Sequence, residues 1–257
     1  MSVLSRTNRA GVATLTMERP QARNALSMEL MNALISAFDD LSKDASTKAV
    51  ILKGAGPAFC AGHDLKEMRA NPSRAFMQET FATCSRLMLA ITRLRQPVIA
   101  EVHGIATAAG CQLVATCDLA VCASDARFAT PGVNIGLFCS TPMVALTRNV
   151  GRKAAMDMLL TGDLVGAERA REIGLVNRVV PDAELAAETR ALAARIAGHS
   201  PRTLAIGKEA FHRQAEMDLP AAYAYAAQVM VRNMMTPDAE EGIDAFLEKR
   251  PPVWPAA

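Results

Sequence analysis

Residues 98–118 most constrain the fold, because they combine a strand signal, a glycine turn and a helix signal in one short stretch. A β-rich run follows Pro97, the chain turns at Gly104, and a helical pattern runs from about Ala109 to Cys117. Small residues let another group approach the backbone, and the first N–H groups of a helix have no partner within it. The stretch therefore predicts a backbone site for an anion or a developing oxyanion.

A second strand–glycine–helix unit precedes this stretch. Residues 49–53 have the pattern of a buried strand, which the glycines and proline of residues 54–57 end. The run Phe-Cys-Ala-Gly-His-Asp-Leu-Lys at 59–66 then leads into a helical pattern, with Asp64 and Glu67 in its first turn, where acidic groups suit the helix dipole. The first part of the chain is therefore expected to alternate strands and helices.

Strand signals end at Val180, and only helical patterns follow. Ala- and Met-rich faces on the later helices, which include Tyr223 and Met230, need a partner surface and favour self-association. Packing on the protein's own core is the alternative. We expect a core over residues 1–195 and a helical oligomerisation region over residues 196–257. The expected C-terminal helices cover residues 183–197, 201–214, 219–235 and 237–250.

The composition excludes several classes of function. With 257 residues, 51% of them hydrophobic, the chain can bury the core of one large domain. A net charge of +2, no basic block and 4% aromatic residues argue against a nucleic-acid partner. We expect neither a membrane span nor secretion from the short apolar runs and the N-terminus. Six cysteines without a C-x-x-C pair favour reduced thiols, and hence a cytoplasmic protein.

Together, the two glycine units resemble the signatures of the enoyl-CoA hydratase/isomerase, or crotonase, superfamily. Residues 59–66 resemble F-x-A-G-x-D-[LI], and residues 97–118 are similar to the glycine-rich turn and helix that follow P-V-I-A-x-V-x-G. The likeness covers nearly the whole chain in order and spacing. Further matching positions are Pro20, Asn24-Ala25-Leu26, Gly174-Leu175-Val176 and residues 246–250.

This resemblance implies an α/β fold, a crotonase-like spiral of ββα units with an all-helical C-terminal extension that builds homotrimers, often paired into hexamers. It also implies a site for an acyl-CoA thioester in fatty-acid and acyl-CoA metabolism. By position, the backbone N–H groups of His63 and Ala109 hold the thioester oxygen. Each such donor can contribute about 2.7–4 kcal/mol to stabilising negative charge on that oxygen.

The coenzyme A contacts are also carried over by position. Arg23 lies in the loop expected at the nucleotide end, Lys66 is a candidate for a phosphate, and Lys249 for the nucleotide of its own or a neighbouring subunit. For each cation the alternative is a solvated surface charge. No separate cofactor is expected, because coenzyme A enters with the substrate, and His63 with Asp64 gives too few ligands for a metal. The residues expected along the pantetheine are Ala61, His63, Asp64, Leu65 and Lys66.

Two departures from the family pattern affect its chemistry. Hydration of an enoyl thioester needs two positioned carboxyl groups, and the family's glutamate positions hold Gln112 and Gly132 here. Neither residue titrates near neutral pH. Because general acid–base groups contribute roughly 10²–10⁴-fold each, hydratase activity is expected to be weak or absent.

Other groups are candidates for the missing proton transfers. They are His63, His103 and Asp64, with a nucleophile such as Cys139 or Ser140 needing a base within reach. Two functions remain open: an enzyme with non-standard proton chemistry, such as an isomerase or thioester hydrolase, or a non-catalytic protein that binds acyl-CoA and regulates. A serine-protease-like relative is disfavoured, because no triad is apparent. The remaining carboxylates near these motifs are Glu67 and Glu101.

Overall fold

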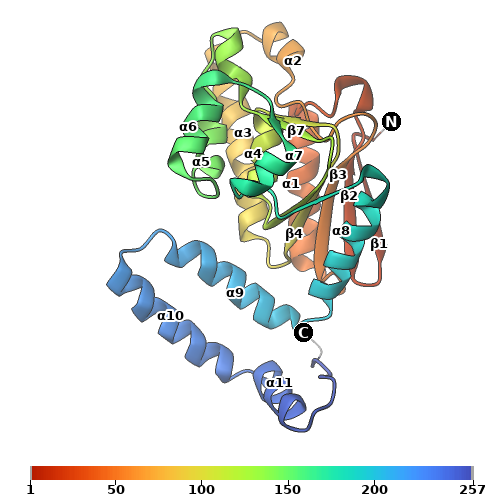
Figure 1. Cartoon of the computed structure of the whole chain (residues 1–257), viewed down its shortest axis with the longest axis vertical. Coiled ribbons are helices and arrows are strands. Elements are labelled where there is room, and N and C mark those ends of the chain that lie inside the picture. Colours follow the sequence, from red (N-terminus) through yellow and green to blue (C-terminus); the bar gives the residue numbers. More distant parts are fainter. Residues whose placement is uncertain (1, 256–257) are drawn as a thin grey trace.

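The computed structural model describes residues 2–255, and its main sheet has six strands in the order β1-β2-β3-β4-β6-β9 (Figure 1). A tight turn at Ala10 and Gly11, both with positive φ, makes β1 and β2 an antiparallel hairpin, and all other pairs are parallel. Sequence patterns predicted all of these strands except β1, whose polar residues form the sheet edge. The strands are β1 (Leu4–Arg9), β2 (Val12–Met17), β3 (Ala49–Gly54), β4 (Val98–Val102), β6 (Leu119–Ala123) and β9 (Arg178–Val180).

A second, three-stranded sheet makes the fold a spiral. After β4 the chain turns at Gly104 into β5 (Ile105–Thr107), and after β6 it continues into β7 (Arg127–Ala129), which pairs with β5 and with β8 (Val165–Gly166). Cys60, which follows β3, bridges to β5 in the same way. Successive repeats thus place one strand in each sheet before a helix follows, as the predicted spiral of ββα units requires.

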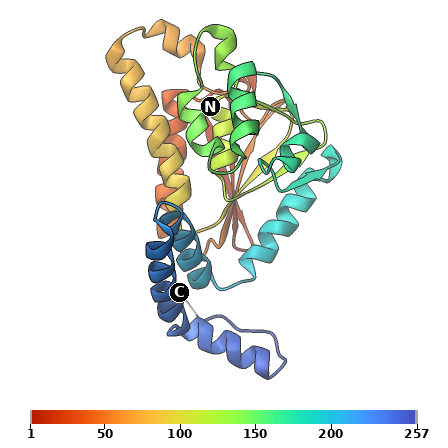
Figure 2. The same ribbon diagram turned by 60° about the vertical axis from the view of Figure 1, so that its left-hand side comes forward.

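Helices cover both faces of the main sheet. One face packs on α1 (Met28–Lys43), α3 (Arg74–Arg93) and α4 (Ala109–Thr116), and the other on α8 (Asp182–Ala197), so that the sheet lies between α3 and α8 in Figure 2. Successive side chains of β4 point to opposite faces of the sheet. Ala100 packs in the core between the sheet and α1, α3 and α4, and Ile99 packs in the core beneath α8. Glu101 therefore projects toward the α8 side.

Local signals fix the first long helix. The Ser27 hydroxyl caps α1 by accepting the N–H of Leu30 at 3.2 Å, and Leu30, Leu34, Phe38 and Leu41 are buried at helical spacing, as predicted. Residues 128–142, expected to be irregular, instead contain part of β7, η2 and the start of α5, because Pro131 begins a 3₁₀ turn. The remaining helices are η1 (Pro20–Ala22), α2 (Leu65–Ala70), η2 (Pro131–Ile135), α5 (Ser140–Leu146), α6 (Arg152–Thr161) and α7 (Ala167–Glu172).

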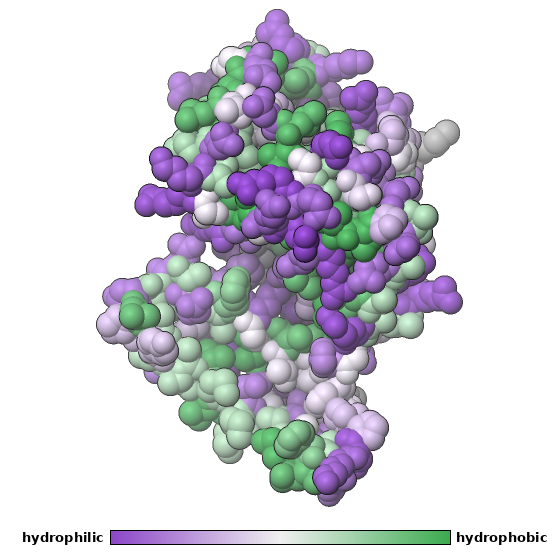
Figure 3. Space-filling view, viewed as in Figure 1, coloured by the Kyte–Doolittle hydropathy of each residue, from purple (hydrophilic) through white to green (hydrophobic). Residues whose placement is uncertain are grey.

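Three C-terminal helices project from this core: α9 (Pro201–Gln214), α10 (Leu219–Met234) and α11 (Pro237–Leu247) (Figures 1 and 2). No residue of α9 or α10 is buried, and green, apolar side chains lie among polar ones over the lower part of the molecule in Figure 3. A partly buried ion pair fastens the region to the core. The ammonium group of Lys208 donates to Asp118 at 2.6 Å and to the carbonyls of Ile91 and Gln96.

Candidate functional site

Two chain segments lie side by side at the carboxyl end of the main sheet, the His63 segment (residues 58–67) and the Ala109 segment (residues 104–116). A backbone ladder joins them: Cys60 N–H donates to the Ile105 carbonyl at 3.2 Å, and Thr107 N–H donates to the Cys60 carbonyl at 3.0 Å. The Thr107 hydroxyl also donates to the Ala61 carbonyl at 3.1 Å. The two motifs that the sequence paired are thus in direct contact.

Two glycines allow this close approach. A Cβ on Gly110 would lie 2.1 Å from the Cys60 carbonyl oxygen, so the start of α4 packs directly on the His63 segment. Gly62 has a φ of +96°, and a Cβ there would lie 2.9 Å from Ala108 Cβ and 3.4 Å from the Ala109 nitrogen. Only glycine fits at either position, because the facing atoms belong to the backbone or to a rigid methyl group.

Within residues 2–255, neither the His63 N–H nor the Ala109 N–H donates a hydrogen bond. Ala109 begins α4, so its N–H has no acceptor within the helix. Ala108 before it adopts φ 50° and ψ −118°, a conformation that L-residues rarely occupy and that sets the direction of the following N–H. Two free main-chain donors therefore come from adjacent segments.

The 19–26 loop holds the His63 segment in place. Leu26 N–H donates to the Gly62 carbonyl at 2.7 Å, and Asp64 N–H donates to the Leu26 carbonyl at 3.1 Å, one on each side of His63. Asn24, buried and in the left-handed region with φ 53°, donates from Nδ2 to the carbonyls of Ala55 and Ala58. Sequence reasoning missed this role, although Asn is the common non-glycine residue in that region.

Asp64 is occupied by structural contacts. Its carboxylate caps α2 by accepting the N–H groups of Lys66 and Glu67, and it pairs with the Arg19 guanidinium at 2.8 Å. Partial burial raises the pKa of Asp64, but the Arg19 hydrogen bond and the two N–H donors outweigh it, so the pKa lies below its usual value of 3.8. As an ionised cap, Asp64 is a poor proton donor at neutral pH.

The His63 imidazole is the polar group of the site without partners. Neither Nδ1 nor Nε2 has a hydrogen-bond partner among the described residues, and both atoms are buried. The ring packs edge-on against Phe81 of α3, with 5.4 Å between centroids. Burial lowers the pKa of His63 below 6.5 and outweighs the weaker influence of the Leu26 backbone, which raises it, so the ring is neutral at pH 7. Each unpaired buried polar atom costs about 1–3 kcal/mol, so a ligand or water that pairs with the ring is favoured.

The two positions at which the family pattern predicts glutamate, Gln112 and Gly132, differ in the space available for a side chain. Gln112 is buried in α4, and its Oε1 faces the Cys84 thiol of α3, which donates to it at 3.8 Å. A Cβ on Gly132 would lie 2.7 Å from the Leu137 carbonyl oxygen and 3.0 Å from Cys139 Sγ. A glutamate fits the α4 position by shape, whereas the backbone around η2 leaves no room for any side chain at residue 132.

Several candidates from the sequence do not reach the two donors. His103 Nε2 is hydrogen-bonded to the Gly56 carbonyl at 2.7 Å, which makes it a structural strand-end histidine. Glu101 lies on the α8 side of the sheet and pairs with Lys53 at 2.6 Å. Burial raises the pKa of the Cys139 thiol, and the neighbouring Ser140 hydroxyl donates to the Phe138 carbonyl rather than to a base. None of these side chains is available for proton transfer at the site.

The residues expected to contact coenzyme A do not all lie near the two donors. Arg23 and Lys66 are exposed at the edge of the His63 segment and form no ion pair within residues 2–255; Leu65 is also exposed, and Ala61 is half-buried. Lys249 follows α11, and α11 lies at the opposite end of the molecule from α2 in both views (Figures 1 and 2). It cannot reach its own chain's site. Among the described residues no group of three His, Cys, Asp or Glu side chains is placed to hold a metal.

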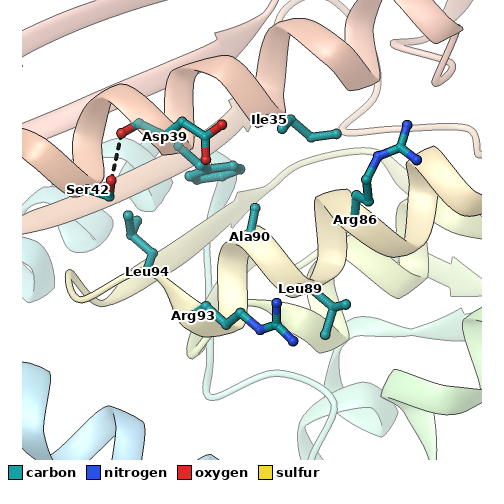
Figure 4. A pocket seen from close by; sticks show the side chains of 9 residues that line it. Ile35, Asp39, Ser42, Arg86, Leu89, Ala90, Arg93 and Leu94 are labelled. Atoms are coloured by element: carbon teal, nitrogen blue, oxygen red, sulfur yellow. Dashed lines mark hydrogen bonds between the residues drawn. The ribbon is translucent and has the colours of Figure 1, made fainter.

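A separate groove of about 310 Å³ runs between α1 and α3 (Figure 4). It contains none of the predicted site residues, and helical spacing places its α3 residues on the opposite side of that helix from Phe81 and Cys84. Its lining residues are Ile35, Phe38, Asp39, Ser42, Arg86, Leu89, Ala90, Arg93 and Leu94.

Comparison with known proteins identifies the class to which this fold and site belong. The family model for enoyl-CoA hydratase/isomerase matches residues 7–256, and the chain belongs to that family. Among its relatives, the mitochondrial enoyl-CoA hydratase domain-containing protein 3 of Mus musculus is 45% identical over 244 residues, covering 95% of this chain and 81% of the relative. The Homo sapiens protein is 47% identical over 247 residues, covering 95% and 80%.

Solved structures agree with this assignment. An enoyl-CoA hydratase from Mycobacterium smegmatis has a TM-score of 0.96 at 57% identity over 98% of each chain. Human enoyl-CoA hydratase domain-containing protein 3 has a TM-score of 0.95 at 45% identity, over 98% of this chain and 100% of that one. The crotonase fold is confirmed. The sequences of residues 103–113 and 130–142 resemble the enoyl-CoA hydratase domain-containing protein 3 branch of the family. The similarity to these relatives confirms that prediction.

The cytoplasmic location expected from the cysteines is contradicted, because the mouse and human relatives are named as mitochondrial proteins. All six cysteines are buried free thiols, as expected. Free thiols argue against an oxidising compartment but do not distinguish one reducing compartment from another, which is why the inference failed. No helix within residues 2–255 combines the length and the apolar character needed to cross a bilayer.

Proposed function

We propose that this protein binds an acyl-CoA thioester, with the N–H groups of His63 and Ala109 forming an oxyanion hole for the thioester oxygen. The observation that carries the proposal is the pair of unengaged main-chain donors on two adjoining segments. Fixed donors of this kind stabilise the negative charge of an enolate or a tetrahedral intermediate. Their direction is set by the Gly62 and Gly110 contacts, so they need no reorganisation when charge develops.

Cations at the rim supply the other half of the substrate contact. Arg23 and Lys66 flank the His63 segment as exposed charges and suit the phosphates of the coenzyme A nucleotide. Lys249 contributes only if a second copy of the chain brings its α11 to this site. The C-terminal helices support that arrangement: Tyr223 is 72% and Phe246 80% exposed, as expected of faces that self-association covers. We propose a homotrimer or hexamer assembled through residues 196–257.

Classical hydration is not the proposed reaction. Gln112 cannot act as a base, and residue 132 has neither a carboxyl group nor room for one. We propose an acyl-CoA protein of fatty-acid metabolism with very weak enoyl-CoA hydratase activity. The second candidate is a non-catalytic protein that binds acyl-CoA and regulates; the absence of both carboxyl groups supports it.

Calorimetric titration with two ligands tests the oxyanion hole. Butyryl-CoA carries the thioester oxygen, whereas S-butyl-CoA, a thioether, lacks it and is otherwise matched. We expect the thioester to bind more tightly by at least about tenfold, which is about 1.4 kcal/mol. Equal affinities would contradict the hole, and absence of binding would contradict the acyl-CoA site. Light scattering of wild type and Phe246→Glu tests the assembly: the variant is expected to be smaller, and a monomeric wild type would contradict it.

A further inference from the structure

The carboxylates and thiols around the two free donors are either engaged in hydrogen bonds or held protonated, which leaves one candidate base. Asp64 caps α2 and pairs with Arg19, and Glu67 Oε2 accepts the Met28 N–H at 3.0 Å. Burial raises the pKa of the thiols on both segments and on α3 to about 12, which makes them poor acids and poor nucleophiles at neutral pH. These thiols are Cys60, Cys84 and Cys111. That candidate is His63.

The His63 ring and the Gln112 amide face the same side of α3. Phe81 contacts the ring, and Cys84, one turn later on that helix, contacts the amide oxygen. The ring belongs to the residue whose N–H is the first donor, and the amide projects from the first turn of the helix that begins with the second. We therefore expect an acyl chain whose thioester oxygen accepts both N–H groups to place its α-carbon near the imidazole.

We propose that the His63 imidazole transfers the α-proton of the bound acyl-CoA thioester, a role that rests on the proposed thioester site. The Cα–H bond breaks and its proton goes to a ring nitrogen. The electron pair of that bond forms a carbon–carbon double bond, and the thioester carbonyl becomes an enolate whose oxygen accepts the N–H groups of residues 63 and 109. The imidazolium then exchanges its proton with solvent and returns one to Cα.

This assignment explains two features of the site. The ring nitrogens have no hydrogen-bond partner in the protein, as expected if the substrate carbon is the group that they serve. The site does not need the two family carboxyl groups, since proton exchange at Cα uses a single base. A buried, neutral imidazole is in the correct protonation state to accept a proton.

Deuterium exchange into butyryl-CoA tests the role. The protein is incubated with butyryl-CoA in D₂O, and mass spectrometry follows exchange of the α-protons, with calorimetry to measure binding of the same thioester. We expect exchange with wild type, and a loss of at least about 10²-fold with His63→Gln. His63→Phe, which removes the two unpaired nitrogens and keeps a ring against Phe81, is a second variant expected to fold, bind and not exchange.

His103→Gln is the matched control, because its ring serves a backbone carbonyl instead of the site; it should exchange at the wild-type rate. Binding without exchange by wild type would overturn the His63 proposal and leave the thioester site intact. Exchange that persists in both His63 variants would do the same, and so would equal losses in the His63 and His103 variants. No binding of butyryl-CoA at all would instead reject the site on which the proposal rests.

Discussion

The two segments that supply the donors hold them in different ways. The Ala109 segment ends in α4, whose residues are all buried, and it is fixed by packing of Gly110 on the Cys60 carbonyl and by hydrogen bonds of β5. The His63 segment is half-exposed, and polar contacts fix it: Asn24 below it, with Arg19 and Asp64 at its end. One donor therefore depends on shape and the other on charge and hydrogen bonding.

This difference implies different sensitivities. Side chains packed against backbone atoms have no free space around them, so a single added methyl group lowers the free energy of unfolding by its full steric cost. Polar contacts near the surface each contribute less to stability, and several of them hold the same segment. Contacts of ionised groups also depend on pH. The chemistry that we propose lies on the polar segment, where a side chain is free to meet substrate, while the packed segment contributes a donor only.

The largest effect is expected from Gly110→Ala. The new methyl group meets the Cys60 carbonyl oxygen, which cannot move without shifting β5, and overpacking of this kind costs about 3 kcal/mol. Gly207→Ala is the matched control: it is also a helical glycine, but no atom lies within 4 Å of its added Cβ, so it should stabilise α9 by up to about 1 kcal/mol. Denaturant unfolding of both variants measures the contrast, and equal effects would contradict the packing argument.

Asn24→Ala should be the most damaging change on the polar side. It leaves the Ala55 and Ala58 carbonyls without their amide donor in a buried setting, which we expect to cost about 2 kcal/mol and to weaken butyryl-CoA binding. Asn8→Ala, at an exposed position, should change the unfolding free energy by less than about 0.5 kcal/mol. Similar losses at both positions would mean that the loop under His63 is not held by Asn24.

Ala108→Gly is expected to raise the free energy of unfolding, whereas the two preceding site variants lower it. A glycine relieves the φ of 50° at the start of α4, which we expect to raise stability by about 1 kcal/mol. Within the same helix, Ala115→Gly should instead lower stability by about 1 kcal/mol, as glycine does in a helix interior. Thermal unfolding of the pair checks this, and destabilisation by Ala108→Gly would show that the backbone is not strained there.

Asp64→Asn should have the smallest effect and the only strong pH dependence. Asparagine still caps α2, so the loss is that of the ion pair with Arg19, up to about 1 kcal/mol at pH 7. Because the folded state lowers the pKa of Asp64, its contribution is complete above the unfolded value of 3.8 and is lost as pH falls through the folded pKa. Acid unfolding curves of wild type and variant should therefore converge; a gap that stays constant would exclude the ion pair as its cause.

Much of the architecture follows from local patterns. Apolar periodicity predicted α1 and the parallel strands, and Ser27 predicted where α1 begins. The edge strand β1 was missed because its residues are polar and its pairing depends on the hairpin turn at Ala10 and Gly11. The 128–142 stretch was expected to be irregular because it is rich in turn-forming residues. The same residues form a 3₁₀ helix there, and its stability depends on neighbouring contacts.

The sequence by itself determined the alternation of strands and helices, because apolar periodicity is a local property of the chain, and its two glycine motifs pointed to the family and to the two neighbouring segments of the site. From the resemblance, it also predicts that Gln112 and Gly132 stand where hydratases of the family carry glutamates. Only the tertiary structure decided which side chains are available: it assigns His103 to a carbonyl and Asp64 to a helix cap, and it leaves the His63 ring unpaired. Availability depends on partners distant in sequence, which no local pattern encodes.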